Sequence, residues 1–114
     1  MLVVGAGPAG LTAAAELRRL GVARVVVVDR EMTPGGIPRH SEHAGYGLRD
    51  LHRVLSGPAY ARALAGTAAR AGAQLRTGCT VTDLRASDGL PGDGDGAQAG
   101  GAGLSCVLTS AAGI

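Results

Sequence analysis

The sequence contains no lysine, phenylalanine or tryptophan, and only two tyrosines and two cysteines among its 114 residues. Without large aromatic side chains, the core has to be built from alanine, valine and leucine, which bury less area per residue. All 11 basic residues are arginines, spread along the chain without a basic stripe interleaved with aromatics. Nucleic-acid binding is therefore not expected. The absence of lysine also argues against a Walker A phosphate loop, which requires that residue.

The two cysteines, Cys79 and Cys106, form neither a CxxC pair nor a zinc-binding spacing. Both fall in candidate strands and are expected to be small core residues. No disulfide framework is predicted, so the reducing cytoplasm is the expected location. The apolar run Leu2–Gly10 is too short and too rich in glycine to span a bilayer, and it lacks the features of a signal peptide. No membrane segment is predicted.

Residues 1–31 have the pattern of a βαβ unit. Leu2–Val4 predicts a short buried parallel strand, and Ala9–Leu20 has the helical period, with Gly21 where a helix C-cap favours positive φ. Arg24–Val28 includes four consecutive valines, which is typical of a strand buried on both faces. The polar face of the helix is expected to meet solvent and consists of Thr12, Glu16, Arg18 and Arg19.

The rest of the chain divides by composition into four predicted segments. They are a loop with a short helix, a helix followed by a strand, a flexible glycine-rich loop, and the start of a meander strand, over residues 32–57, 58–86, 87–103 and 104–114. The short helix is suggested by apolar residues between Leu48 and Leu55. The longer helix begins after Pro58 and ends near Gly72, and Gly78 is expected to kink the strand or pair of strands that follows.

The motif Gly5-Ala6-Gly7-Pro8-Ala9-Gly10 fits the GxGxxG pattern, follows a predicted strand and opens a predicted helix. Gly5 permits the tight turn, Gly7 lets a pyrophosphate approach the backbone, and Gly10 lets the helix pack close to the strand. Free N–H groups and the dipole of the helix N-terminus attract phosphate. The motif therefore predicts a dinucleotide-binding site.

An acidic residue, Asp29, ends the second strand and follows Gly10 at close to the spacing of about 20 residues expected for a ribose-binding acid. Arg30 could bind a 2′-phosphate, which would indicate NADP, but the carboxylate of Asp29 repels such a phosphate. An unphosphorylated adenosine ribose is favoured. FAD and NAD share this half of the molecule, and both remain candidates from the residues alone.

The run VVGAGPAGL, followed by VVVVDRE and PGG, resembles the FAD-binding start of flavoproteins with two dinucleotide-binding domains, such as glutathione and thioredoxin reductases. The later GGIPRH and GLRDLHRVLSGPAYARAL are similar to a branch that includes the flavin subunits of opine, hydroxyproline and sarcosine-type dehydrogenases. The resemblance covers residues 1–85. It implies an α/β, Rossmann-like FAD/NAD(P)-binding fold with a parallel sheet, present here in part, and an FAD-dependent oxidoreductase as the parent enzyme.

The same resemblance implies a role for individual residues. The motif from Gly5 to Gly10 would hold the pyrophosphate of FAD, Asp29 would bind the adenosine ribose, and Arg30 would lie beside the adenine. Gly36 would pass close to the cofactor on its flavin-facing side. The backbone of Val81 would meet the edge of the adenine, and Thr80 would do so if the register differs by one residue.

The resemblance leaves the substrate chemistry unassigned. No catalytic residue is identified and no metal site is predicted; a place for His40 near the flavin is the alternative to a plain surface loop. A small-molecule substrate, an NAD(P)-binding domain and partner subunits would belong to the parent enzyme. Two other functions stay open, namely an NAD-binding dehydrogenase domain and a non-catalytic, truncated fragment of a flavoprotein.

Overall fold

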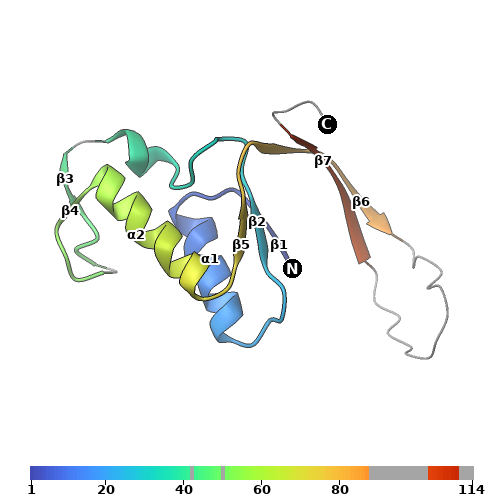
Figure 1. Ribbon diagram of the computed structural model, residues 1–114, viewed down its shortest axis with the longest axis horizontal. Helices are drawn as coiled ribbons and strands as arrows, with labels where there is room; N and C mark the ends of the chain where they lie inside the picture. Colours follow the sequence, from blue (N-terminus) through green and yellow to red (C-terminus); the bar gives the residue numbers. More distant parts are fainter. Residues whose placement is uncertain (42, 50, 88–102, 111–114) are drawn as a thin grey trace.

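A computed structural model describes residues 1–41, 43–49, 51–87 and 103–110 of the chain. Three short parallel strands form the central sheet: β1 (Leu2–Val4), β2 (Val26–Val28) and β5 (Gln74–Arg76), in the order β1-β2-β5. Helices α1 (Pro8–Arg19) and α2 (Gly57–Arg70) pack side by side against one face of this sheet (Figure 1). The predicted glycine-rich loop, residues 87–103, lies almost entirely outside the described residues.

The core lies between the two helices and the sheet. One row of side chains across the sheet is directed at the helices. It consists of the register partners Val3, Val27 and Leu75. Small side chains let the helices approach closely. The core cluster consists of Ala6, Leu11, Ala14, Val25, Val27, Leu64, Ala68 and Ala73. The sequence-based expectation of a core of alanine, valine and leucine is confirmed for these buried residues.

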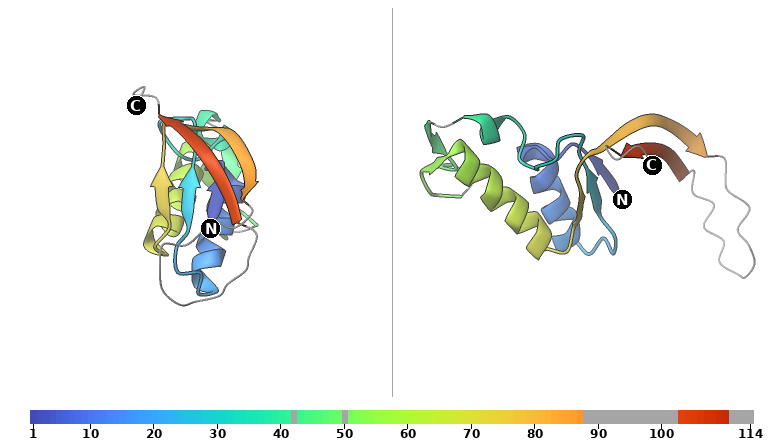
Figure 2. Two further views of the ribbon diagram at one scale, coloured as in Figure 1. Left: turned by 90° about the vertical axis from the view of Figure 1, so that its right-hand side faces the viewer. Right: turned by 45° about the horizontal axis from the view of Figure 1, so that its top comes forward.

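The opposite face of the sheet is approached by a two-stranded antiparallel hairpin of β6 (Cys79–Ser87) and β7 (Gly103–Ser110) (Figure 2). A groove of about 840 Å³ separates the hairpin from the sheet, and Val4 in it is 63% exposed. The prediction that Leu2–Val4 is a buried strand is therefore wrong: Val4 is exposed, and Leu2 and Val3 are only half-buried. Val26 of β2 is half-buried as well. The reason is that α1 and α2 cover the same face. The groove is lined by Met1, Leu2, Val4, Arg24, Val26, Arg76, Leu84, Cys106 and Leu108.

Both long helices end in the same way. Gly21 has φ +93°, and the N–H groups of Gly21 and Val22 donate to the carbonyls of Arg18 and Leu17. Gly72 has φ +98° and closes α2 with the equivalent pair of bonds. This is the Schellman arrangement, which satisfies helix carbonyls that have no partner inside the helix. The predicted helix ends at Gly21 and near Gly72 are confirmed.

Arg18 connects the ends of these helices. Its Nη1 donates to the carbonyls of Val22 (2.7 Å) and Ala23 (2.6 Å), and its Nε donates to the carbonyl of Ala71 (3.1 Å). The side chain is half-buried, so the expectation that it belongs to a solvated helix face is wrong. Its neighbour Arg19 does lie on the exposed face, where it pairs with Glu16. That hydrogen bond lowers the pKa of the Glu16 carboxyl.

The segment between β2 and α2 differs most from the prediction. It contains a short 3₁₀ helix, η1 (Ile37–His40), and a small antiparallel pair of β3 (Ala44–Tyr46) and β4 (Leu55–Ser56). The described residues between Gly47 and Leu55 form a turn instead of the expected short helix. The carbonyl of Gly47 accepts bonds from the N–H groups of Leu51 and Arg53, and His52 has φ +54°, which ends the turn.

Three rings stack at this corner of the molecule. Tyr46 lies between His43, with ring centroids 5.1 Å apart, and Tyr60 of α2, with centroids 5.5 Å apart. Tyr60 enters α2 one turn after Ser56, whose Oγ accepts a hydrogen bond from the N–H of Ala59 at 3.4 Å. The stack thus fixes the β3–β4 pair against the start of α2. In the part of the chain that the structure describes, neither α1 nor α2 combines the length and the hydropathy of a membrane-spanning helix.

Candidate dinucleotide-binding site

The GxGxxG motif forms the loop between β1 and α1, and its glycines have different physical roles. Gly5 has φ +101°, a conformation that glycine adopts without strain. A Cβ on Gly10 would lie 1.9 Å from the carbonyl oxygen of Gly5, so only glycine allows this approach of helix to strand. By contrast, a Cβ on Gly7 would meet no atom within 4 Å. The backbone at Gly7 is therefore open to a ligand.

The start of α1 offers hydrogen-bond donors beside this open backbone. Gly7 is the N-cap and Pro8, which has no N–H, occupies the first turn. The N–H of Leu11 donates the first i to i−4 hydrogen bond of the helix, to the carbonyl of Gly7 at 3.0 Å. The N–H groups of Ala9 and Gly10 precede it and have no carbonyl within the helix to accept them. Such a helix end favours an anion by its donors and its dipole.

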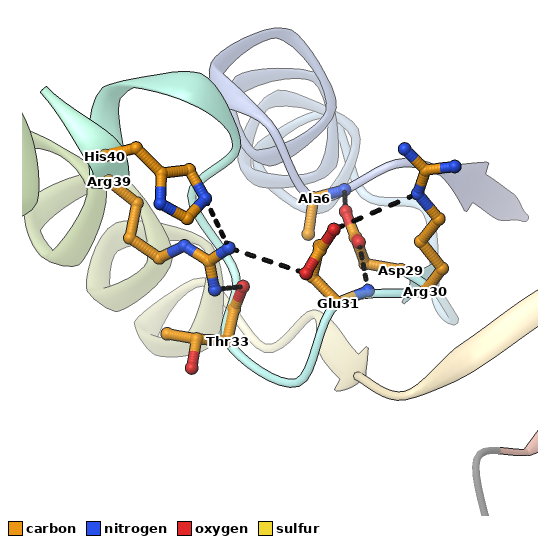
Figure 3. A network of polar contacts seen from close by, with 7 residues as sticks. All are labelled: Ala6, Asp29, Arg30, Glu31, Thr33, Arg39 and His40. Atoms are coloured by element: carbon orange, nitrogen blue, oxygen red, sulfur yellow. Dashed lines mark hydrogen bonds and ion pairs between the residues drawn. The ribbon is translucent and has the colours of Figure 1, made fainter.

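The carboxylate of Asp29, at the end of β2, lies against the same loop (Figure 3). Its Oδ2 accepts a hydrogen bond from the N–H of Ala6 at 2.6 Å, and its Oδ1 accepts one from the N–H of Glu31 at 2.8 Å. The backbone of Asp29 also pairs with Arg76 of β5 and with Cys79 at the start of β6. Asp29 is thus fixed at the junction of the loop, the sheet and the hairpin.

A cleft of about 240 Å³ opens beside Asp29 at the carboxyl ends of β1 and β2. It brings together four of the residues predicted from the sequence, Gly5, Asp29, Arg30 and Val81, and it includes Thr80, the alternative to Val81. In an α/β sheet, ligands bind outside the carboxyl ends of the parallel strands. The remaining lining residues are Val4, Val28 and Cys79.

Cys79 is the residue of this cleft that the sequence did not reveal. It was expected in the core, but it is a half-buried free cysteine on the wall of the cleft. Cys106 is likewise half-buried and lines the separate groove behind the sheet. Cys79 follows Gly78, which has φ +63° and turns the chain from β5 into β6. In the sequence, Gly78 is the signal that could have indicated that Cys79 lies at the start of β6, beside the cleft.

The Pro34-Gly35-Gly36 segment lies against the other side of the motif. Gly36 has φ +66°, and a Cβ there would come within 3.0 Å of the Cα of Gly7. Gly35 has φ +129° and donates its N–H to the carbonyl of Ala6 at 2.7 Å. Gly36 was predicted to lie near the cofactor, whereas the bond from Gly35 could not be foreseen from spacing.

Arg39, which the sequence also did not single out, anchors this segment. Its Nη1 donates to the carbonyl of Thr33 at 3.0 Å, and its Nη2 lies 3.6 Å from the Glu31 carboxylate and 2.8 Å from Nε2 of His40 (Figure 3). Its side chain is 19% exposed, and its Nε is buried without a partner among the described residues. Arg30, in contrast, is 80% exposed and reaches Glu31 only at 3.9 Å.

The histidines form no metal centre within the described part of the chain, where no three His, Cys, Asp or Glu side chains gather closely enough to hold an ion. His40 is exposed and contacts Arg39, and His43 belongs to the ring stack with Tyr46. Glu42, between them, lies outside the described residues.

The family described as an NAD(P)-binding Rossmann-like domain matches residues 3–71, which include α1, β2, α2 and all of β1 except Leu2. No curated protein sequence matches the chain significantly.

Several solved structures share the fold. T. acidophilum thioredoxin reductase is 23% identical with a TM-score of 0.71, and the match covers 94% of this chain and 29% of that one. Thermovibrio ammonificans THI4 is 20% identical with a TM-score of 0.70, covering 97% and 47%. The atypical thioredoxin reductase TRi from Desulfovibrio vulgaris Hildenborough is 24% identical with a TM-score of 0.65, covering 98% and 31%. The chain spans less than half of each structure, and the predicted α/β, Rossmann-like fold is confirmed.

Proposed function

The chain belongs to the NAD(P)-binding Rossmann-like domain family, and from this we propose that it binds the ADP half of FAD as part of an FAD-dependent oxidoreductase. The observation that carries the proposal is the open backbone at Gly7, which is the N-cap of α1 and follows by two residues Gly5, a lining residue of the cleft beside Asp29. A phosphate fits the first feature and an adenosine fits the second.

Each predicted residue has a role in this proposal. The backbone from Gly5 to Gly10 binds the pyrophosphate, with Ala6, Pro8 and Ala9 shaping the loop. Asp29 accepts hydrogen bonds from the adenosine ribose in the 240 Å³ cleft. Arg30 and the backbone of Val81 flank the adenine, since both line that cleft. Gly36, whose backbone approaches Gly7 and Pro8 and does not line the cleft, would lie toward the flavin.

FAD is proposed over the nicotinamide cofactors for two reasons. The Asp29 carboxylate at the ribose position repels the 2′-phosphate of NADP. The Gly35-Gly36 pair packs against the phosphate loop, and this pair belongs to the sequence run that resembles FAD-binding flavoproteins. NAD is the second candidate, because the family description names NAD(P) and NAD carries the same adenosine diphosphate.

When bound, the flavin would supply the redox chemistry by accepting a hydride from a small-molecule substrate, while the protein supplies binding and orientation. None of the described residues is proposed to be catalytic.

The matched thioredoxin reductases and THI4 are each more than twice as long as the part that this chain covers. An NAD(P) site, partner subunits and a relation to opine, hydroxyproline and sarcosine-type dehydrogenases are therefore proposed for a parent enzyme. The two free thiols suit a cytoplasmic location.

The test is calorimetric titration of the purified chain with FAD, ADP and NAD. We expect both FAD and ADP to bind. NAD carries the same adenosine diphosphate and should bind no more tightly than ADP, whereas FAD should bind more tightly than NAD because its flavin side gains the approach to Gly36. Gly7→Val should weaken binding about hundredfold, because loss of two hydrogen bonds to charged phosphate costs roughly 3 kcal/mol. The added Cβ would meet no atom within 4 Å, and Gly7 has an extended backbone with φ −77° that valine adopts readily, so folding should persist. Gly66→Ala in α2, where the added Cβ meets only the flexible guanidinium of Arg70, is the matched control and should bind normally.

Alkylation of the two cysteines locates the ligand independently. Bound FAD or ADP should slow the reaction of Cys79 with iodoacetamide, since Cys79 lines the cleft. The reaction of Cys106, in the other groove, should not change. Tighter binding of NAD than of FAD would favour the NAD-binding dehydrogenase. If no nucleotide bound while circular dichroism showed a folded chain, the chain would be a non-catalytic fragment of a flavoprotein.

A further inference from the structure

The peptide groups on both sides of Ala6 are held by the rest of the protein. The N–H of Ala6 donates to Oδ2 of Asp29 at 2.6 Å, and its carbonyl accepts from the N–H of Gly35 at 2.7 Å. Ala6 is 2% exposed and lies between Gly5 and Gly7, the two most adaptable positions of the phosphate loop. Fixing Ala6 therefore fixes the direction of the loop before any ligand arrives.

Asp29 is the side chain on which this arrangement depends. Its second oxygen accepts from the N–H of Glu31 at 2.8 Å, so one carboxylate joins the loop after β1 to the chain that leaves β2 (Figure 3). Each carboxylate oxygen can accept more than one hydrogen bond. Asp29 can therefore hold Ala6 and still accept bonds from a ribose.

We infer that Asp29 is a positioning residue for the pyrophosphate as well as a partner of the ribose. It acts on the pyrophosphate through the backbone of Ala6, which it holds in the binding conformation. Without this bond, the ligand would have to order the loop, and ordering the backbone of a single residue weakens binding roughly tenfold. The inference rests on the proposed function, because it concerns the same nucleotide site.

The negative charge of Asp29 and its positioning of the loop predict opposite effects of its removal on the affinity for a phosphate. The negative charge of Asp29 repels a phosphate nearby, so removing it should tighten binding of the phosphate if charge were its only effect. If Asp29 holds the loop, its removal should weaken binding of the phosphate. Asp29→Asn separates the two effects at Ala6, because the amide oxygen can still accept from Ala6 N–H although the charge and the bond from Glu31 N–H are gone. Asp29→Ala removes both.

The experiment titrates the full chain and these two variants with ADP and with 2′,3′-dideoxy-ADP, which lacks the ribose hydroxyls. We expect Asp29→Ala to weaken binding of dideoxy-ADP by about tenfold, whereas Asp29→Asn should stay within about threefold of wild type. Equal or tighter binding of dideoxy-ADP by Asp29→Ala would overturn the inference but leave the proposed function intact. Failure of the wild-type chain to bind ADP or FAD would remove both.

Hydrogen exchange provides a second measurement that does not require Asp29→Ala to fold. In the ligand-free wild-type chain and in Asp29→Asn, the amide of Ala6 should exchange at least about tenfold more slowly than that of Gly7, which the Asp29 carboxylate does not bind. Exchange of the Ala6 amide as fast as that of Gly7 in the wild-type chain would show that the bond does not hold the loop, and would refute the positioning role.

Discussion

The side chain of Arg18 connects the ends of α1 and α2, and its removal should destabilise the domain. Its guanidinium donates to three carbonyls, those of Val22, Ala23 and Ala71, at the ends of both helices. Hydrogen bonds from a charged donor contribute about 1.5 kcal/mol or more each, so three give at least about 4.5 kcal/mol. The side chain is half-buried, and water can replace part of this. We expect Arg18→Ala to lower the free energy of unfolding by about 2–4 kcal/mol.

Such a loss is large for a domain of this kind. Domains of this size are stable by only about 5–15 kcal/mol, and this core is built from small side chains. At roughly 4 °C for each kcal/mol, the melting temperature should fall by about 8–16 °C. Urea denaturation followed by circular dichroism measures the free energy directly, provided that the transition is two-state.

The matched control is Arg19→Ala on the neighbouring residue of α1. Within the described part of the chain, Arg19 pairs with Glu16 on the exposed surface, and such pairs contribute about 0–1 kcal/mol. Arg18→Lys should be intermediate, because the ammonium keeps the charge at the helix ends but cannot reach three carbonyls at once. A loss below about 0.5 kcal/mol for Arg18→Ala, or an equal loss for Arg19→Ala, would refute the proposed role of the three bonds.

Three further substitutions test other parts of the structure. Gly10→Ala should cost more than about 2 kcal/mol in urea denaturation, since its Cβ would overlap the Gly5 carbonyl oxygen; an unchanged midpoint would contradict this. Ser56→Ala should cost about 1 kcal/mol by loss of the cap of α2, and an equally stable variant would count against the cap. Glu16→Gln should lower the melting temperature slightly at pH 7. Because the folded-state pKa of Glu16 is lowered, its contribution is present above the unfolded pKa and disappears as pH falls below the folded one. A difference that persisted at pH 2 would exclude this origin.

The features that the sequence predicted well depend on neighbouring residues along the chain. The strand Leu2–Val4, the helix up to Gly21 and the motif between them follow from local period and glycine chemistry, and they agree with the structure to within one residue. The position of Asp29 at the end of β2, beside the motif, has the same local origin, because a single helix of fixed rise connects the two strands. Its role toward a ribose stays a prediction.

The features that were missed depend on contacts between distant segments. Arg18 was placed on a solvated face because its partner Ala71 lies 53 residues further on, beyond the reach of any helical period. Val4 was expected to be buried because apolar runs do not reveal that both helices cover the same face. The turn after Gly47 was expected to be helical because its leucines have helical spacing, whereas pairing of β3 with β4 and the positive φ of His52 decide the conformation.

The ring stack of Tyr46 and Tyr60 has a spectroscopic consequence. The chain has no tryptophan and no other tyrosine, so all of its intrinsic fluorescence originates at the corner where β3 meets the start of α2. Far-ultraviolet circular dichroism, in contrast, reports mainly on α1 and α2 as a whole. Unfolding curves from the two signals compare one corner with the entire domain. Coincident midpoints would mean that the segment after β2 unfolds together with the core, and an earlier fluorescence transition would identify that corner as a separate unit of lower stability.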